Sequence, residues 1–185
     1  MGLEKKTDRR DESMHLAVGL WALISAWKWG DWRHWRNYHT TMMYFALGNL
    51  LYNFLCANHF LWKLDPDFLP NHSMTEMVYT FITFPATALL FLSNYPSDPK
   101  KTVAHYAKWI GLYAGIELIF HLTDRIIYQH GWNLGWSILF DCTMFPMLRL
   151  FHKKPLLAYF ISFLMCIGWV WLFDIPVNVP IEDRK

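Results

Sequence analysis

The sequence predicts an all-α fold, an integral membrane helical bundle with five or six transmembrane helices and no soluble domain. Two observations predict this fold class. Hydrophobic residues make up 54% of the 185 residues and charged residues only 17%, against about 25% charged in an average soluble domain. The charged residues also gather in short clusters, and long apolar stretches separate them. This composition excludes a disordered chain, a collagen-like chain and a disulfide-rich scaffold.

The expected elements follow in order along the chain. Residues 1–12 form a polar tail of mixed charge, residues 13–173 form the bundle, and residues 174–185 form a polar C-terminal tail. Six apolar stretches lie within the bundle, at residues 13–29, 38–61, 75–93, 103–128, 132–150 and 155–173. A helix needs about 20 residues to cross a bilayer, so the first stretch is marginal and the others are long enough. Because a backbone in lipid must satisfy its own hydrogen bonds, these stretches are expected to be helices.

Basic residues predict the orientation of the bundle. The connections at residues 28–37, 94–102 and 149–154 are rich in Lys and Arg, and the alternate connections carry few. The basic connections are therefore expected to be cytoplasmic. The net charge of +2 is too balanced for a nucleic-acid partner, and no basic stripe interleaved with aromatic residues is present.

The fourth stretch carries a stripe of polar side chains. Its members, each a helical turn or so apart, are Tyr113, Glu117, His121, Asp124 and Tyr128. In a helix these positions fall on one narrow face. An ionisable group at membrane depth costs at least about 2.5 kcal/mol, so this face is expected to look into the bundle.

Polar side chains also mark the second, third and fifth stretches. Counting from the centres of the stretches places Asn49, Thr83, Glu117 and Asp141 at similar depth, near the middle of the membrane. Two carboxylates there do not both ionise cheaply, so one is expected to hold a proton unless a cation or His121 compensates. The candidate binding residues are Asn49, Asn53, Thr80, Thr83, Tyr113, Glu117, His121, Asp124 and Asp141.

Proline and glycine add two expectations about the helices. Phe84-Pro85 and Phe145-Pro146 predict breaks in the third and fifth stretches, and broken helices beside polar residues form ion or substrate sites in transporters. The G-x-x-x-G motif at Gly111–Gly115 indicates close helix packing, either within the bundle or in a homodimer.

Three functions are consistent with these residues. The leading hypothesis is a small transporter, channel or ligand-binding membrane protein that takes a proton, a small ion, or a small apolar or polar ligand between the second and fifth stretches. The second is an intramembrane enzyme acting on a lipid or isoprenoid, with Glu117 and His121 as acid and base. No nucleophile elbow, phosphate loop, CxxC pair or zinc-protease motif favours an enzyme. The third is a structural or assembly protein of the cell or spore envelope.

No cofactor is predicted for the polar site. The residue types leave one alternative, a divalent metal held by Glu117, His121 and Asp141, because His and carboxylate ligands suit zinc, iron and manganese. The spacing E-x-x-x-H matches neither H-E-x-x-H nor the E-x-x-H of di-iron bundles.

Four stretches of the sequence carry a resemblance to a known family. They are WKWGDWRHWRNYHTTMMYFALGNLLYNFL, FPATALLFLSNYP, GWNLGWSILFDCTMFPMLRL and HKKPLLAYFISF. Together they resemble a family of small multi-pass membrane proteins from endospore-forming Gram-positive bacteria, over most of the chain from about residue 27 to about residue 173. The resemblance implies location in a bacterial plasma membrane or a spore membrane, with the bilayer as partner. It assigns no role to any residue.

Overall fold

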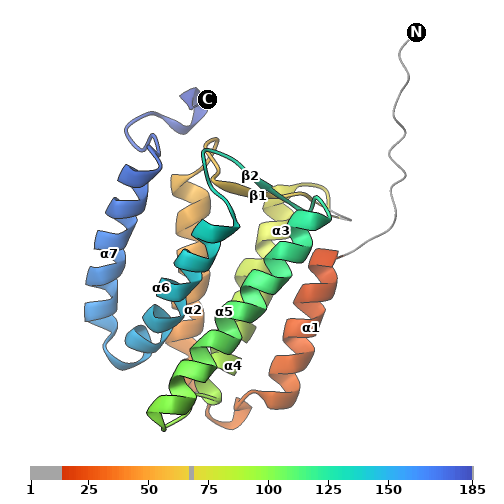
Figure 1. The fold of residues 1–185 in the computed structure, drawn as a ribbon, viewed down its shortest axis with the longest axis vertical. Coiled ribbons are helices and arrows are strands. Elements are labelled where there is room, and N and C mark those ends of the chain that lie inside the picture. Colours follow the sequence, from red (N-terminus) through yellow and green to blue (C-terminus); the bar gives the residue numbers. More distant parts are fainter. Residues whose placement is uncertain (1–13, 67–68, 185) are drawn as a thin grey trace.

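The computed structural model describes residues 14–66 and 69–184, and the predicted tail at residues 1–12 lies outside them. This part of the chain forms six helical segments joined by short connections (Figure 1). Five of them are single α-helices: α1 (Met14–Trp29), α2 (Arg36–Leu55), α5 (Pro99–Leu122), α6 (Leu134–Lys153) and α7 (Pro155–Leu172). The other segment is continuous through α3 (His72–Val78), a π-helical turn η2 (Tyr79–Thr83) and α4 (Phe84–Ser93).

The helical segments run side by side between two ends of the molecule (Figure 1). One end carries a two-stranded antiparallel sheet of β1 (Trp62–Leu64) and β2 (Ile126–Tyr128), in which Trp62 lies opposite Tyr128. The other end carries the α1–α2, α4–α5 and α6–α7 connections. The sheet therefore ties the α2–α3 connection to the α5–α6 connection on one side of the bundle.

The sheet corrects the predicted ends of two helices. α2 ends at Leu55 and α5 ends at Leu122, several residues earlier than the apolar stretches predict. Asn58 and Asp124 follow these ends with φ values of 60° and 57°. Asn and Asp tolerate this left-handed conformation, which is typical of helix termination. The expectation of one helical stripe is therefore wrong for Asp124 and Tyr128, which lie beyond α5.

Local capping signals set the starts of the other helices. The side chains of Asn71, Asp98 and Asn133 accept hydrogen bonds from backbone N–H groups in the first turns of α3, α5 and α6. Pro99 and Pro155 begin α5 and α7, at positions where a missing N–H group removes no intrahelical bond. These helices consequently start where the connections end.

Neither proline interrupts its helix, in contrast to the expectation of two breaks. Pro85 directly follows the π-helical turn, in which the Phe84 N–H group donates to the carbonyl of Tyr79. The wider turn gives the proline ring room within a continuous helix. Pro146 lies inside α6, which remains helical as far as Lys153.

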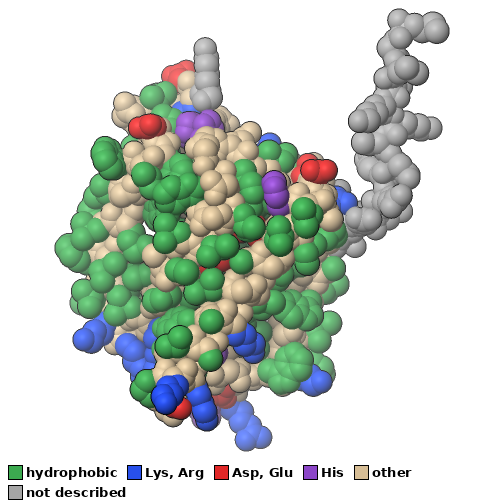
Figure 2. Space-filling view, viewed as in Figure 1, with side chains coloured by type: hydrophobic (Ala, Val, Ile, Leu, Met, Phe, Trp, Pro, Cys, Tyr) green, Lys and Arg blue, Asp and Glu red, His purple; other side chains and the backbone are tan. Residues whose placement is uncertain are grey.

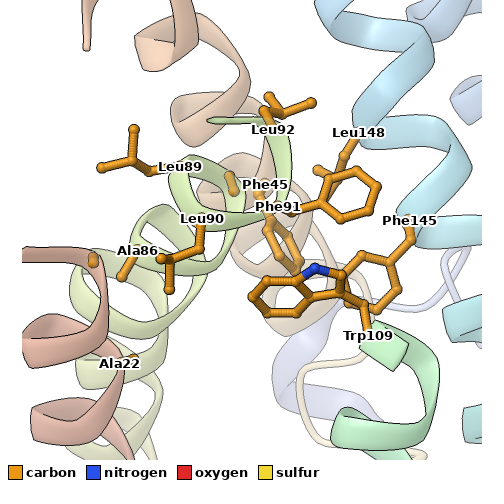
Figure 3. Close-up of a cluster of buried hydrophobic side chains, with 12 residues drawn as sticks. Ala22, Phe45, Ala86, Leu89, Leu90, Phe91, Leu92, Trp109, Phe145 and Leu148 are labelled. Atoms are coloured by element: carbon orange, nitrogen blue, oxygen red, sulfur yellow. The ribbon is translucent and has the colours of Figure 1, made fainter. Parts of the chain in front are cut away.

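The largest apolar core lies among α1, α2, α4, α5 and α6 (Figure 3). Phe91 of α4 and Phe145 of α6 are fully buried at its centre, with ring centroids 5.2 Å apart. Trp109 of α5 and Leu148 of α6 pack against them. Because these side chains lie late in α4 and α6 and early in α5, the core fills the bundle toward the α4–α5 connection.

Three of the helical segments are long and apolar enough to cross a membrane, fewer than the five or six that the sequence predicts. They are His72–Ser93, Leu134–Lys153 and Pro155–Leu172. α7 is the most exposed of them, since Ala158 is its one buried residue. Its outward side chains include Leu156, Phe160, Phe163 and Trp171, each at least 60% exposed.

Charge separates the two ends of the molecule. The connections at residues 28–37, 94–102 and 149–154 all lie at the end opposite the sheet, where Lys and Arg side chains gather in Figure 2. The predicted basic connections thus share one end of the bundle.

The C-terminal segment folds back over the sheet end instead of forming a free tail. Its short 3₁₀ helix is η3 (Ile181–Asp183). Arg184 donates from Nη1 to the carbonyl of Leu55 over 2.7 Å, and Asn58 donates from Nδ2 to the carbonyl of Ile181 over 2.9 Å. The guanidinium group therefore caps the C-terminus of α2, where a positive charge is favourable.

The G-x-x-x-G motif makes no close packing contact within the described chain. A Cβ atom added at Gly111 or Gly115 would meet nothing within 4 Å. By contrast, a Cβ atom at Gly19 would lie 2.9 Å from Cγ1 of Val78. The close approach of helices that glycine permits is thus found between α1 and α3.

Candidate ligand site

A cavity of about 1110 Å³ extends through the bundle and is lined by side chains from all six helical segments. Most of its lining is apolar, and examples are Trp21, Leu51, Leu112, Phe140 and Met165. Its polar lining includes Asn49, Glu76, Thr83, Thr87, Tyr113, Glu117, Ser137 and Asp141. A large, mainly apolar cavity with a few polar groups is the usual form of a small-molecule site.

The first polar group along this cavity is centred on Glu76 of α3, and we call it the Glu76 cluster. Asn49 Nδ2 donates to Glu76 Oε2 over 2.8 Å and to Thr80 Oγ1 over 2.9 Å. Asn53 Nδ2 donates to the same carboxylate oxygen over 3.2 Å. His72 Nε2 lies 3.9 Å from Glu76 Oε1. The buried carboxylate of Glu76 thus accepts two amide hydrogen bonds at Oε2, and at 3.9 Å the imidazole of His72 lies near Oε1 without a hydrogen bond.

The second polar group is centred on Glu117 of α5, and we call it the Glu117 cluster. Tyr128 of β2 donates to Glu117 Oε1 over 2.7 Å, and Ser137 of α6 donates to the same oxygen. Trp132 Nε1 in turn donates to Ser137 Oγ over 2.8 Å. The cluster therefore joins α5, the sheet and the start of α6.

Asp141 lies one helical turn beyond Ser137 on α6 and also lines the cavity. Its side chain is buried, at 5% exposure, and its Oδ2 atom has no hydrogen-bond partner. Thr83 is also buried and lines the cavity, and its Oγ1 atom has no partner either. A buried polar atom without a partner costs free energy, so such atoms require an explanation.

The π-helical turn separates the environments of three threonines in this segment, Thr80, Thr83 and Thr87. Thr80 belongs to the Glu76 cluster, whereas Thr87 accepts a hydrogen bond from Tyr113 over 2.9 Å. In a regular α-helix, residues at spacings of three and four share a face. The extra residue in the π turn rotates the following part of the helix, so Thr83 and Thr87 no longer continue the face of Thr80.

The structure brings the nine predicted site residues together only in part. Asn49, Thr83, Tyr113, Glu117 and Asp141 line the cavity, and Asn53 and Thr80 contact the Glu76 cluster. His121 and Asp124 are exposed, and neither lines the cavity. Within residues 14–66 and 69–184, no group of three or more His, Cys, Asp or Glu side chains is arranged to hold a metal ion. His121 thus lies outside the cavity that Glu117 and Asp141 line.

Two functional features were missed by the sequence reasoning. Glu76 is absent from the predicted site residues, although its spacing of four from Thr80 places both on one helical face. The second feature is an apolar groove between α1 and α5, lined by Met14, Ala17, Val18, Trp21, Leu112, Ile116, Ile119 and Phe120. Val18, Trp21, Leu112, Ile116 and Phe120 line both the groove and the large cavity. The groove therefore adjoins the cavity, which no local sequence signal indicates.

A pair of histidines lies apart from both clusters, in connections at the sheet end. The rings of His59 and His130 are stacked with centroids 3.6 Å apart. Burial and the neighbouring imidazole of His59 lower the pKa of His130 below its usual value. Both effects favour the neutral form of the His130 imidazole.

Comparison of the chain with protein-family models, with curated proteins and with solved structures finds no match. The function must therefore be inferred from the geometry of the chain itself.

Proposed function

We propose that the chain is a multi-pass membrane protein with five or six transmembrane helices that binds a small ligand between them, as a small transporter, channel or ligand-binding protein. The observation that carries this proposal is the cavity of about 1110 Å³ with the buried, unpartnered carboxylate oxygen of Asp141 in its wall. A ligand that donates to Asp141 would compensate the cost of this atom, which no group within the described residues 14–66 and 69–184 does.

The proposed number of spans exceeds the three segments that are apolar enough by composition. α2 and α5 are less apolar because they carry Asn49, Asn53 and Glu117, and these side chains line the cavity or hydrogen-bond within it. Polar residues that face the interior of a bundle do not oppose insertion as lipid-facing ones do. The exposed apolar side chains of α7 supply a surface suited to lipid.

The basic end of the bundle is placed in the cytoplasm in this proposal, following the positive-inside rule. The family resemblance of the sequence favours a bacterial plasma membrane or a spore membrane. The C-terminus, which lies at the sheet end (Figure 1), would then be outside the cytoplasm.

The intramembrane enzyme is less well supported. Its acid–base pair would be Glu117 and His121, but the exposed imidazole of His121 packs on the ring of Tyr128 with centroids 4.9 Å apart and does not line the cavity. A purely structural role fits the Glu76 cluster, whose carboxylate accepts two amide hydrogen bonds, but it does not account for the unpartnered oxygen of Asp141.

Two cysteines of α6 and α7 test the proposal. Cys142 is exposed on the outer surface, whereas Cys166 lines the cavity. Single-cysteine variants retaining one or the other would be reconstituted in nanodiscs and treated with a small, charged methanethiosulfonate reagent. We expect Cys166 to react through the cavity and Cys142 to be protected by lipid, because thiolates do not form in hydrocarbon. Fast reaction at Cys142 with none at Cys166 would overturn the proposal.

A further inference from the structure

The large cavity constrains the chemical class of its ligand through its shape and lining. Its volume of about 1110 Å³ slightly exceeds the range of about 300–1,000 Å³ typical of sites for drug-sized molecules. The lining away from the two clusters consists of side chains such as Trp21, Leu112 and Phe140. The body of the ligand must therefore be large and apolar.

The charged residues of the cavity wall indicate which sign of ligand charge the cavity favours. Among the residues that the structure describes, this wall contains three acidic side chains, Glu76, Glu117 and Asp141, and one formally cationic side chain, Lys108. Lys108 lies nine residues before Glu117 on α5, which separates them by about 13 Å along the helix. Glu76 has the imidazole of His72 3.9 Å from its Oε1 atom. No Lys or Arg side chain other than Lys108 lines the cavity among the described residues. The middle of the cavity is thus acidic without a matching positive charge.

The buried atoms without hydrogen-bond partners indicate that the ligand carries a hydrogen-bond donor. Asp141 Oδ2 and Thr83 Oγ1 are buried without partners, and an ammonium group offers three N–H donors and no acceptor. Trp109 Nε1 also lacks a partner, but it lies one residue from Lys108, toward the basic end of the cavity. The donor-bearing group of the ligand therefore belongs near Asp141 and not near Trp109.

We propose that the cavity binds a lipophilic organic cation, a molecule with a large apolar body and a protonated amine that lies against Asp141 and Glu117. This inference rests on the proposed function and names its ligand class. The amine supplies the compensating positive charge that two carboxylates in one cavity require.

The apolar groove between α1 and α5 gives such a molecule a route from lipid. It shares five lining residues with the cavity, and all of its lining side chains are apolar. Ala17 and Ile119 are exposed and line the groove alone. In this proposal, a lipophilic body enters at the groove and reaches the acidic middle of the cavity by displacing the side chains that line both.

Three probes that share one apolar body and differ in the head group test the inference. Radiolabelled phenylbutylamine, phenylbutanol and phenylbutyrate would be measured by equilibrium dialysis against the full chain in nanodiscs, with empty nanodiscs subtracted. We expect the amine to bind at least about tenfold more tightly than the alcohol, and the carboxylate to bind least tightly. Asp141→Asn and Glu117→Gln should each weaken amine binding about tenfold and leave alcohol binding unchanged.

Asp124→Asn is the matched control for these variants. Asp124 follows the same helix as Glu117, is exposed outside the cavity, and has a positive φ that Asn accepts. It should leave binding of the amine unchanged. Ala17→Trp should slow amine binding without changing its affinity, whereas Leu20→Trp, on the lipid-facing side of the same helix, should change neither.

The outcomes separate the ligand class from the proposed function. Equal or tighter binding of the alcohol or the carboxylate would overturn the cationic class and leave the ligand site intact. Amine binding that survives both Asp141→Asn and Glu117→Gln in monodisperse protein would also overturn it. If none of the probes binds and Cys166 does not react with the thiol reagent, the proposed function fails together with the inference.

Discussion

The Glu76 cluster and the region of Glu117 and Asp141 both place carboxylates inside the bundle, but their hydrogen bonding differs. Glu76 receives donors from Asn49 and Asn53, and His72 lies beside its other oxygen. Asp141 has a buried oxygen without any partner. A buried acid with matched partners stabilises a fold, whereas one without them lowers stability. The difference indicates that the Glu76 cluster holds helices together, whereas the region of Glu117 and Asp141 is the part to which we assign the proposed ligand.

The largest expected effect is on the Glu76 cluster. Glu76→Ala should lower the free energy of unfolding by about 3 kcal/mol, because the Asn49 and Asn53 amides would lose a charged acceptor in a buried site. Thermal unfolding in detergent, followed by tryptophan fluorescence, measures this change. A loss below about 0.5 kcal/mol would show that the cluster does not hold α2 to α3. The contrast with the region of Glu117 and Asp141 would then be wrong.

The next effect has the opposite sign. Asp141→Leu should leave stability unchanged or raise it by about 1 kcal/mol, since an apolar side chain of similar size removes an unpartnered buried carboxylate. The same unfolding measurement applies, with Phe145→Ala as a control that removes a fully buried ring from the core. A destabilisation as large as that of Glu76→Ala would mean that Asp141 also has a structural role.

Tyr128→Phe tests the position of Glu117 between these two extremes. The variant removes one of the two donors to Glu117 Oε1 and keeps the ring. We expect a loss of about 1 kcal/mol in unfolding free energy. Tyr159→Phe, on α7 away from both clusters, serves as the control. An unchanged unfolding free energy in Tyr128→Phe would mean that this hydrogen bond does not stabilise the fold. Glu117 would then resemble Asp141, as an acid available to the proposed ligand.

The smallest expected effect is a pH dependence of the unfolding free energy that comes from His130. It must be subtracted when the Glu76 and Asp141 variants are compared at different pH values. Because the pKa of His130 is lowered in the folded chain, the unfolded chain binds more protons near the usual histidine pKa. The contribution of His130 to stability is therefore full above about pH 6.5 and is lost as the pH falls through its folded pKa. Unfolding scans between about pH 5 and 8 should show this decline, and His130→Asn should reduce it. The exposed His39→Asn variant should not.

The sequence predicted the helical architecture because each apolar stretch contains one helical segment. It also predicted the shared end of the basic connections, since charge clusters alternate with apolar stretches. The proximity of Glu117 to Ser137 follows from the α5–α6 hairpin around Gly131, whose φ is 80°. These features depend on residues near one another along the chain or on simple periodicity.

The remaining features depend on contacts that periodicity does not encode. The β1–β2 pairing joins Trp62 to Tyr128 across more than sixty residues. Because periodicity does not encode such a pairing, the apolar stretches alone predict longer helices than the structure contains. His15, which is 1% exposed, binds the hydroxyl of Tyr79 from a distant helix over 2.8 Å. The position of the α1–α5 groove beside the cavity likewise arises from tertiary packing.

The π-helical turn at Tyr79–Thr83 has a consequence for how this chain tolerates insertions and deletions. A π turn corresponds to one extra residue in an α-helix. Deleting a single residue from this turn would restore a regular helix and rotate everything before it by about 100° relative to Thr87. The Glu76 side chain would then leave its amide partners on α2. Deletion of one residue should therefore destabilise the fold here, whereas the connection at residues 94–98 between α4 and α5 should tolerate such a deletion.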